Sequence, residues 1–418
     1  MLSAEQRKDV GQYLDENLDQ IVKLAQDICS FATENPPGKE FEACVDFLDE
    51  VMREEGLETR KIQVPRAYQE KYAPKSTSGY DRFNLISFWN TGGGRTLHFN
   101  SHYDVVPATE GWKTPPYAPV VKGNRLYGRG TMDMKGCLAA SIYAVKALRA
   151  CGLTPKWNIE LSFVADEEIG GLCGTGYIVR QKLVKPHSAV VCEGGMEEVI
   201  MYGHRGVLWA EVEVYGVAAH GSNPALGINA FDKGMDLAHR FREHHQEIAR
   251  QKSEYPVNPP ILRYPTMTMG GVSGGGDKTN IIPDHFFFTI DRRLIPEERA
   301  RDVQEAYRQI VKQAHKEDKH LKARISFPQA FNAGLTDPKA ALCEVAKKAV
   351  RSVYGRPGKL QIFGAFTDLH FFTNYAKCPT VGYGVKGKGL HGNREYAEVK
   401  SLAQTAQVYA EIAMGMKG

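Results

Sequence analysis

The chain has 418 residues, of which 42% are hydrophobic and 24% are charged, and its formal net charge at pH 7 is +4. This length exceeds one ordinary hydrophobic core and predicts two domains. The basic residues are dispersed and no apolar stretch approaches the roughly 20 residues of a membrane span, so we expect neither a nucleic-acid nor a membrane partner. The N-terminus lacks a signal-peptide pattern and the eight cysteines are scattered. We therefore expect a cytoplasmic protein with buried thiols.

The first 90 residues predict two amphipathic helices, a loop and a strand. Residues 3–33 carry an apolar face at helical spacing, which ends at Asn35-Pro36-Pro37-Gly38. A second helix is predicted over residues 40–55. The polar segment 64–80 is predicted to be a long surface loop, and residues 84–89 a strand.

Three later predicted strands end in ionisable side chains. They are residues 96–100 followed by Ser101-His102-Tyr103-Asp104, residues 157–165 followed by Asp166-Glu167-Glu168, and residues 188–192 followed by Glu193-Gly194-Gly195. Open α/β sheets bind their ligands at the carboxyl ends of strands. The Asp104 carboxylate can fix the tautomer of His102 for metal binding. Adjacent carboxylates after a buried strand are costly without cations, although a solvated acidic turn also explains them.

The run Gly128-Arg129-Gly130-Thr131-Met132-Asp133-Met134-Lys135-Gly136 places one carboxylate in a loop that enters a helix. Apolar residues then recur at helical spacing as far as Cys151-Gly152. Backbone N–H groups near a helix start can orient the Asp133 carboxylate. Taken alone, a capped helix with a turn explains this run equally well.

From about Gly203 the pattern predicts a small α/β sandwich inserted into the larger domain. Its predicted elements are strands at 207–214, 266–272 and 285–291, and helices at 230–251 and from Pro296 to 319. The chain then returns to a helix at 337–353, a strand at 380–385 and a helix at 400–416. We assign residues 1–202 and 329–418 to one discontinuous domain and residues 203–328 to the inserted domain.

Six side chains from these ends and loops point to a pair of metal ions. They are His102, Asp133, Glu167, Glu168, Glu193 and His391. Imidazoles combined with carboxylates suit two divalent first-row ions, Zn²⁺ foremost, with Mn²⁺ or Co²⁺ as alternatives. Two cations about 3.5–4 Å apart can polarise a carbonyl and deprotonate a shared water. One carboxylate left off the metals can then serve as general base.

The ordered motifs of the chain resemble those of the M20 metallopeptidase family, in its acetylornithine deacetylase / succinyl-diaminopimelate desuccinylase branch. They are Ser101 to Asp104, Gly128 to Gly136, Asp166 to Gly170, Cys192 to Gly194, Gly216 to Ser222, and Gly389 to His391. The resemblance implies a catalytic α/β/α domain with a central, mostly parallel sheet, as in zinc exopeptidases. It also implies that the inserted α/β sandwich is a lid and dimerisation domain.

The resemblance assigns the metal ligands and the base. Asp133 would bridge both metals, with His102 and Glu193 completing one site, and Glu168 and His391 the other. Glu167 would be the general base and acid of catalysis.

Four further roles follow from the resemblance. Asp104 would orient His102, and His220 would reach the active site of the partner subunit to stabilise the oxyanion, so a homodimer is expected. Asn280 and Arg293 would contact the substrate, Arg293 by gripping its carboxylate. A turn residue and a surface ion pair are the alternative explanations for these last two.

By resemblance, the expected function is metal-dependent removal of an acyl group from an N-acyl amino acid or a related small amide. One alternative is a dipeptidase or carboxypeptidase-type exopeptidase of the same family, and another is hydrolysis of an unusual C–N bond such as that of an aromatic amine. The final motif departs from the common His-x-x-Asn-Glu because Arg394 replaces the asparagine, which leaves the substrate open. A non-catalytic, metal-stabilised binding protein is the alternative from another class, but it would have no use for an unligated Glu167.

Overall fold

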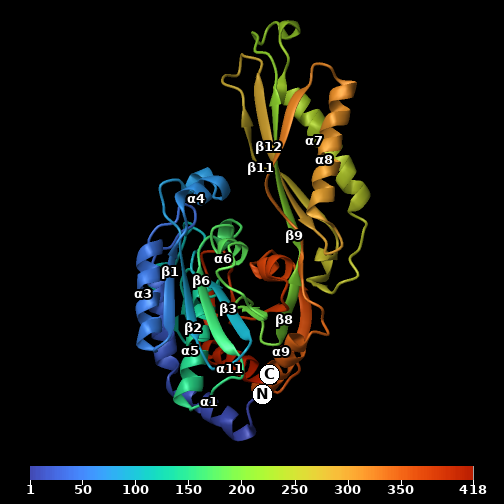
Figure 1. Cartoon of the computed structure of the whole chain (residues 1–418). Helices are drawn as coiled ribbons and strands as arrows, with labels where there is room; N and C mark the ends of the chain where they lie inside the picture. Colours follow the sequence, from blue (N-terminus) through green and yellow to red (C-terminus); the bar gives the residue numbers. More distant parts are fainter. Residues whose placement is uncertain (418) are drawn as a thin grey trace. The chain divides into compact units, whose positions relative to one another are not determined.

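The computed structural model describes residues 1–417 and divides into two compact units (Figure 1). The first unit comprises Met1–Gly203, Leu335–Gln361 and the chain from Thr367 onward, and the second comprises His204–Gly334 and Ile362–Phe366. Among the described residues, none of the helices is both long and apolar enough to span a bilayer. All eight cysteines are free thiols.

The first unit is built on a mixed sheet whose central strands are parallel. Its strands follow the order β1-β2-β6-β3-β7-β16-β8-β15. Their bounds are β1 Glu58–Gln63, β2 Phe83–Trp89, β3 Thr96–His102, β6 Asn158–Val164, β7 Ser188–Val191, β8 Val199–His204, β15 Lys359–Phe363 and β16 Thr380–Gly382. Strand β3 runs parallel to both β6 and β7, with Phe99 opposite Leu161 on one side and Val190 on the other. The carboxyl ends of these three strands therefore lie at one edge of the sheet.

Helices cover both faces of this sheet. They are α1 Ala4–Glu16, α2 Leu18–Ser30, α3 Phe41–Glu54, α4 Arg66–Tyr72, α5 Lys135–Ala150, α6 Thr175–Arg180, α9 Ala341–Tyr354, α10 Leu369–Phe371 and α11 Val399–Gly415. The connection β3-α5-β6 leads from β3 to its neighbour on one side, and the connection β6-α6-β7 leads back across β3 to its neighbour on the other side. Right-handed crossovers therefore place α5 and α6 on opposite faces (Figure 1). This is the expected α/β/α architecture.

A second, small sheet in the first unit joins distant parts of the chain. It has the order β17-β18-β5-β4. The bounds are β4 Val120–Lys122, β5 Arg125–Tyr127, β17 Gly387–Lys388 and β18 Tyr396–Glu398. Because β18 pairs with β5, the loop that carries His391 lies beside the segment that leads to Asp133.

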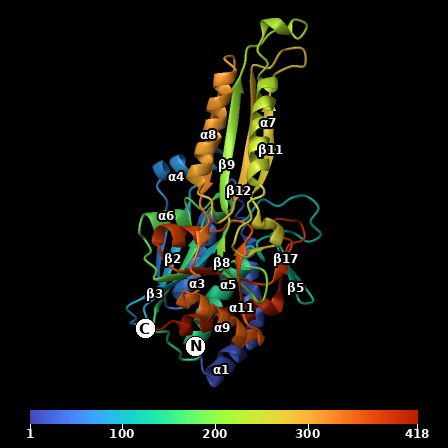
Figure 2. The same cartoon turned by 90° about the vertical axis from the view of Figure 1, so that its right-hand side faces the viewer.

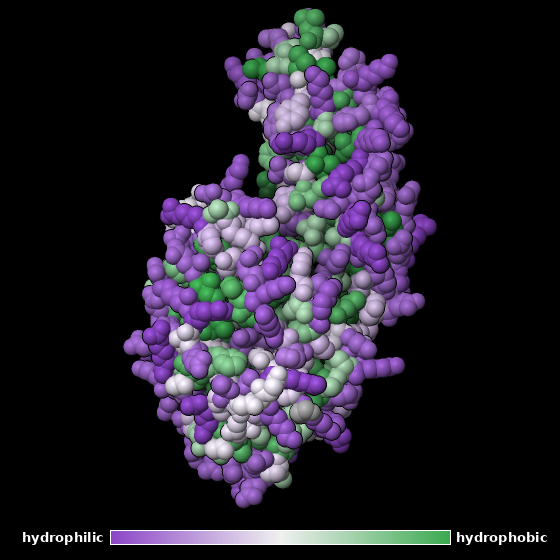
Figure 3. Space-filling model, viewed as in Figure 1, coloured by the Kyte–Doolittle hydropathy of each residue, from purple (hydrophilic) through white to green (hydrophobic). Residues whose placement is uncertain are grey.

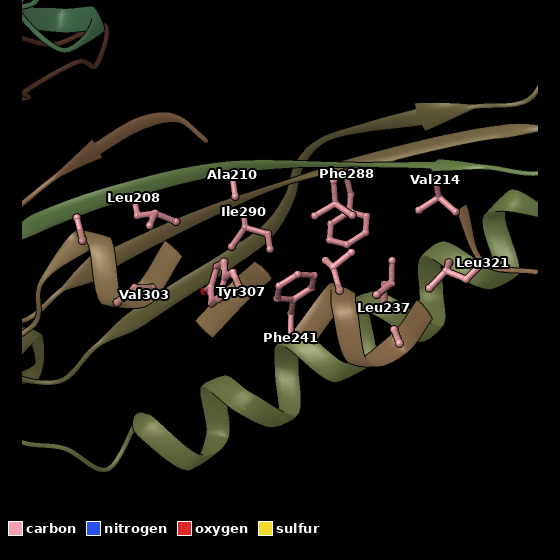
Figure 4. Close-up of a cluster of buried hydrophobic side chains, with 14 of the residues drawn as sticks. Leu208, Ala210, Val214, Leu237, Phe241, Phe288, Ile290, Val303, Tyr307 and Leu321 are labelled. Carbon is pink, nitrogen blue, oxygen red and sulfur yellow. The ribbon is translucent and has the colours of Figure 1, made fainter. Parts of the chain in front are cut away.

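The second unit is a four-stranded antiparallel sheet with two helices on one face (Figure 2). The strands, in the order β11-β12-β9-β13, are Thr266–Gly275, His285–Leu294, Gly206–Tyr215 and Lys322–Phe331, and the helices are α7 Ala230–Ile248 and α8 Ala300–Glu317. Alternate residues of β9 face the helices, where the ring of Phe241 lies 5.0 Å from that of Tyr307 and 6.3 Å from that of Phe288 (Figure 4). Hydrophilic side chains predominate on the visible surface of both units (Figure 3).

Three local predictions differ from the structure. The first predicted helix is two helices, because Asn17 donates a side-chain hydrogen bond to the Tyr13 carbonyl (2.7 Å) and ends α1. The predicted loop 64–80 contains α4, held by packing of the Tyr68 ring 4.8 Å from that of Tyr177. Pro296 does not open a helix, since α8 begins at Ala300.

Candidate metal centre

The acidic and imidazole side chains gather where the parallel strands of the first unit end. His102 is the last residue of β3, and Glu167 and Glu168 lie in a 3₁₀ turn directly after β6. Glu193 follows β7 by two residues. Because β3 lies between β6 and β7 in the sheet, the order of the strands alone brings these side chains to the same edge.

Asp133 is the side chain that joins the two histidines. Its Oδ1 lies 3.3 Å from Nε2 of His102, and its Oδ2 lies 3.1 Å from Nε2 of His391. The same His391 nitrogen lies 3.2 Å from Oε2 of Glu168. One ligand atom each of His102, Asp133 and Glu168 lie within 4.8 Å of one another. A carboxylate whose two oxygens face different imidazoles has the donor arrangement needed to bridge two cations.

Glu193 supplies an independent sign that cations belong here. Its Oε2 is buried and has no hydrogen-bond partner among the described residues. Burial, followed by the charge of Asp133, raises the pKa of Glu193 well above its usual range. A buried carboxylate oxygen without a partner is costly, and coordination of a divalent ion would satisfy it. The residues therefore fit a metal centre.

The two paired glutamates also titrate unusually. Burial raises the pKa of Glu168 to about 7, with the charge of Asp133 adding to the effect. Burial and then the charge of Glu193 raise the pKa of Glu167 well above its usual range. Perturbed carboxyl groups crowded at a sheet edge are typical of functional sites. Glu167 Oε2 is 4.0 Å from Nε2 of His102.

The pKa values of the two imidazoles are also raised, which for a histidine favours the charged form. Hydrogen bonds to Asp133 and Glu168 raise the pKa of the half-exposed His391 to about 10. Burial acts to lower the pKa of His102, but hydrogen bonds to Asp104 and Asp133 outweigh it and raise that pKa well above 6.5. Burial likewise opposes ionisation of Asp133, yet the hydrogen bonds from both histidines hold its pKa well below the usual range.

Asp104 contacts both His102 and the turn of the paired glutamates. Nδ1 of His102 donates to the backbone carbonyl of Asp104 at 2.9 Å and lies 3.5 Å from the carboxylate Oδ1. The carboxylate accepts the backbone N–H of Glu167 (3.2 Å) and of Glu168 (3.3 Å). With Nδ1–H engaged, the neutral form of His102 presents the Nε2 lone pair toward Asp133.

The partners of the Asp133 loop were not predicted from the sequence. Oε1 of Glu395 accepts the backbone N–H of Met132 (3.0 Å) and of Asp133 (3.2 Å), and its Oε2 lies 2.7 Å from Arg129. Arg129 also donates to the backbone carbonyl of His391 at 3.2 Å. This pair therefore connects the loops of two proposed ligands. The available sequence signal for this pair was that Arg129 lies in the motif Gly128 to Gly136 and Glu395 lies in the final motif, which begins at His391.

Asp368 is a further buried carboxyl group that the sequence analysis did not assign. It accepts the hydroxyl proton of Thr175 at 2.6 Å, and burial raises its pKa to about 7. Its position directly before α10 gives no periodic or motif signal.

His220, Asn280 and Arg293 belong to the second unit. Ser222 donates its backbone N–H to Nδ1 of His220 at 3.2 Å, which leaves the proton of the neutral imidazole on Nε2. The Asn280 carbonyl accepts the backbone N–H of Gly221 at 2.8 Å, so Asn280 lies next to His220. Arg293 is paired with Asp291, with 2.9 Å between Nε and Oδ1.

Comparison with known proteins places the chain among metallohydrolases and peptidases. The family model of peptidase family M20/M25/M40 matches residues 98–415. An uncharacterized metallohydrolase of Methanocaldococcus jannaschii is 27% identical, covering 94% of this chain and 99% of its own length. Succinyl-diaminopimelate desuccinylase 1 of Alteromonas mediterranea is also 27% identical, covering 80% of this chain and 85% of its own. The dipeptidase Dug1p of Saccharomyces cerevisiae has the same fold, with a TM-score of 0.80 at 18% identity and 98% coverage of both chains.

Proposed function

Because the chain belongs to peptidase family M20/M25/M40, we propose that this hydrolase removes the acyl group from an N-acyl amino acid or a related small amide. The observation that carries the proposal is Asp133, whose two oxygens face His102 and His391 while Glu167 stands beside them. Similarity to a succinyl-diaminopimelate desuccinylase over most of the chain supports a deacylase. Likeness in fold to a dipeptidase makes exopeptidase activity the second candidate.

The proposed ligands divide into two sets that share Asp133. His102 and Glu193 would complete one set, and Glu168 and His391 the other. Mixed imidazole and carboxylate donors favour Zn²⁺, with Mn²⁺ or Co²⁺ as alternatives. When bound, two such ions supply positive charge that polarises the substrate carbonyl and lowers the pKa of a water.

Glu167 would move the proton. It accepts a proton from the attacking water as the new C–O bond forms, and it delivers that proton to the amine nitrogen as the C–N bond breaks. The position of Glu167 suits both halves of this transfer, because its Oε2 lies 4.0 Å from Nε2 of His102 and the carboxylate therefore stands beside the proposed ligands. Asp104 holds the backbone N–H of Glu167 and so helps to fix its orientation.

The inserted segment 203–328 would act as the lid and dimerisation domain. With its Nδ1 engaged by Ser222, His220 would offer Nε2–H to the oxyanion in the partner subunit of a homodimer. Asn280 would contact the substrate beside it. Arg293 would bind the substrate carboxylate, for which its pairing with Asp291 would have to open.

Replacement of Glu167 tests the proposal directly. A panel of N-acetyl and N-succinyl amino acids, dipeptides and aromatic-amine amides would be offered to the metal-loaded protein and to Glu167→Gln. The expected result is turnover of an acylated amino acid by the unaltered chain, with Glu167→Gln retaining its metal but losing about 10²-fold or more of kcat. Preference for free-amine dipeptides would select the exopeptidase. Undiminished turnover by Glu167→Gln would show that Glu167 is not the base. Two bound metals without turnover of any substrate would favour a binding protein.

A further inference from the structure

A buried polar network lies behind the turn that carries Glu167 and Glu168. Its centre is Asp104, whose two carboxylate oxygens accept the backbone N–H groups of both glutamates. These contacts are closer than the 3.5 Å between the carboxylate and Nδ1 of His102. The Asp104 carboxylate therefore acts on the turn at least as directly as on the imidazole.

Asn35 links Asp104 to a second carboxylate. Its Nδ2 donates to Oδ2 of Asp104 at 2.8 Å and to Oδ1 of Asp166 at 2.9 Å. Both carboxylates and Asn35 are fully buried. An amide that donates one proton to each of two buried carboxylates holds them together, and an apolar residue in its place would leave both less satisfied.

Arg82 supplies the compensating charge. Its Nε lies 2.9 Å from Oδ1 of Asp166, and its NH2 group donates to the Pro37 carbonyl at 2.9 Å. Arg82 is itself completely buried, with its guanidinium 5.1 Å from the ring of Phe41. The guanidinium is thus enclosed, and it anchors Asp166 to the segment that contains Asn35.

The anchored residue has a strained backbone. Asp166 has φ +66°, in the left-handed region that a side chain with a Cβ rarely adopts. Such a conformation persists only when the surroundings hold it in place, and it redirects the chain immediately before Glu167 and Glu168. The side-chain contacts of Asp166 therefore help to set the direction that the chain takes after β6, and with it the placement of the Glu167 and Glu168 side chains.

We propose that Asn35 and Arg82 are positioning residues that act through Asp104 and Asp166 to set the turn of Glu167 and Glu168. They touch neither substrate nor reacting atoms. Their effect is the placement of a carboxylate that moves protons and of one that ligates metal, so the inference rests on the roles proposed above for those two glutamates.

The test compares Asn35→Ala with Asn158→Ala in the full chain. Asn158 is the matched control because it begins β6, at the opposite end of the strand from Asp166. It also bridges backbone groups, accepting from Thr91 N–H at 3.0 Å and donating to the Gly93 carbonyl at 2.8 Å. Each variant would be loaded with Co²⁺, and its absorption spectrum, Co²⁺ affinity, melting temperature, kcat and KM would be measured.

The expected result for Asn35→Ala is a loss of about 10- to 100-fold in kcat or in Co²⁺ affinity, a smaller change in KM, and an altered Co²⁺ spectrum. Asn158→Ala should lower the melting temperature while keeping the spectrum and kcat. Arg82→Lys, which retains a positive charge beside Asp166, should recover part of what Arg82→Met loses. Asn35→Ser serves in place of Asn35→Ala if the alanine variant does not fold.

The failures of the two proposals are distinguishable. If the unaltered chain hydrolyses no amide, the proposed function is wrong, while a Co²⁺ spectrum changed by Asn35→Ala but not by Asn158→Ala still supports the positioning role. If Asn35→Ala matches Asn158→Ala in spectrum, affinity and kcat, the positioning role is overturned whatever the substrate.

Discussion

The pair Arg129–Glu395 allows a quantitative prediction about the first unit. Both side chains are buried, their charged atoms are 2.7 Å apart, and Glu395 also accepts two backbone N–H groups. Removing one partner of a buried ion pair costs about 3–5 kcal/mol, because the remaining charge is left without compensation. At about 2–4 °C per kcal/mol for a unit of this size, Arg129→Met should lower the melting temperature of the first unit by about 6–20 °C.

The assay is calorimetry of the metal-free protein together with Co²⁺ titration. Arg129→Met should also weaken Co²⁺ binding, since Arg129 and Glu395 hold the loops of His391 and Asp133. Arg292→Met is the control, because the buried Arg292 forms an ion pair at 2.5 Å with the partly buried Glu298 in the second unit. It should destabilise its own unit and leave Co²⁺ affinity unchanged.

A double variant separates charge compensation from packing. Arg129→Met combined with Glu395→Leu removes both charges, so its loss of stability should be smaller than the sum of the two single losses. The reasoning is refuted if Arg129→Met costs less than about 1 kcal/mol with unchanged Co²⁺ affinity, or if the two single losses add.

Two further predictions concern pH and the core of the second unit. The pKa of His391, about 10 in the metal-free fold against 6.5 ordinarily, means that this group stabilises the metal-free protein fully below about pH 6.5 and that its contribution is lost as the pH rises toward 10. Melting temperatures measured in chelator should therefore fall over this window by more for the unaltered chain than for His391→Ala, and parallel curves would argue against the assignment. In the second unit, Phe241→Ala removes the ring packed against Phe288 and Tyr307 and should cost about 3–5 kcal/mol. Calorimetry would measure this loss, with Co²⁺ affinity unchanged, and a loss below about 1 kcal/mol would show that the ring is not part of the core.

The α/β fold was predictable because its central strands are unambiguous. Strands β3, β6 and β7 are short and largely buried, with apolar residues at alternate positions in β6 and an apolar run in β7, and the side chains that follow them mark the proposed functional edge of the sheet. Peripheral strands carry weaker signals. Strand β13 alternates polar and apolar residues only from Lys322 to Phe327, after which Pro328 interrupts the pattern, and its register changes between Ser326 and Gln329.

The supports of the proposed site could not be predicted in the same way. Arg129 and Glu395 are 266 residues apart in sequence, and Asn35 is 131 residues from Asp166. Periodicity reports only which face of an element is buried, and motifs report only residues close in sequence. Pairings across such distances follow from the packing of the complete sheet, and they became visible only with the coordinates.

The order of the proposed ligands along the chain also has a consequence for synthesis. His102, Asp133, Glu168 and Glu193 emerge first, the whole second unit follows, and His391 and Glu395 come afterwards. At about 5–20 residues per second on the ribosome, the nascent chain carries an acidic cluster for many seconds before its last imidazole and the partner of Arg129 exist. Completion of the proposed ligand set is therefore a late event, which requires translation past His391 and Glu395.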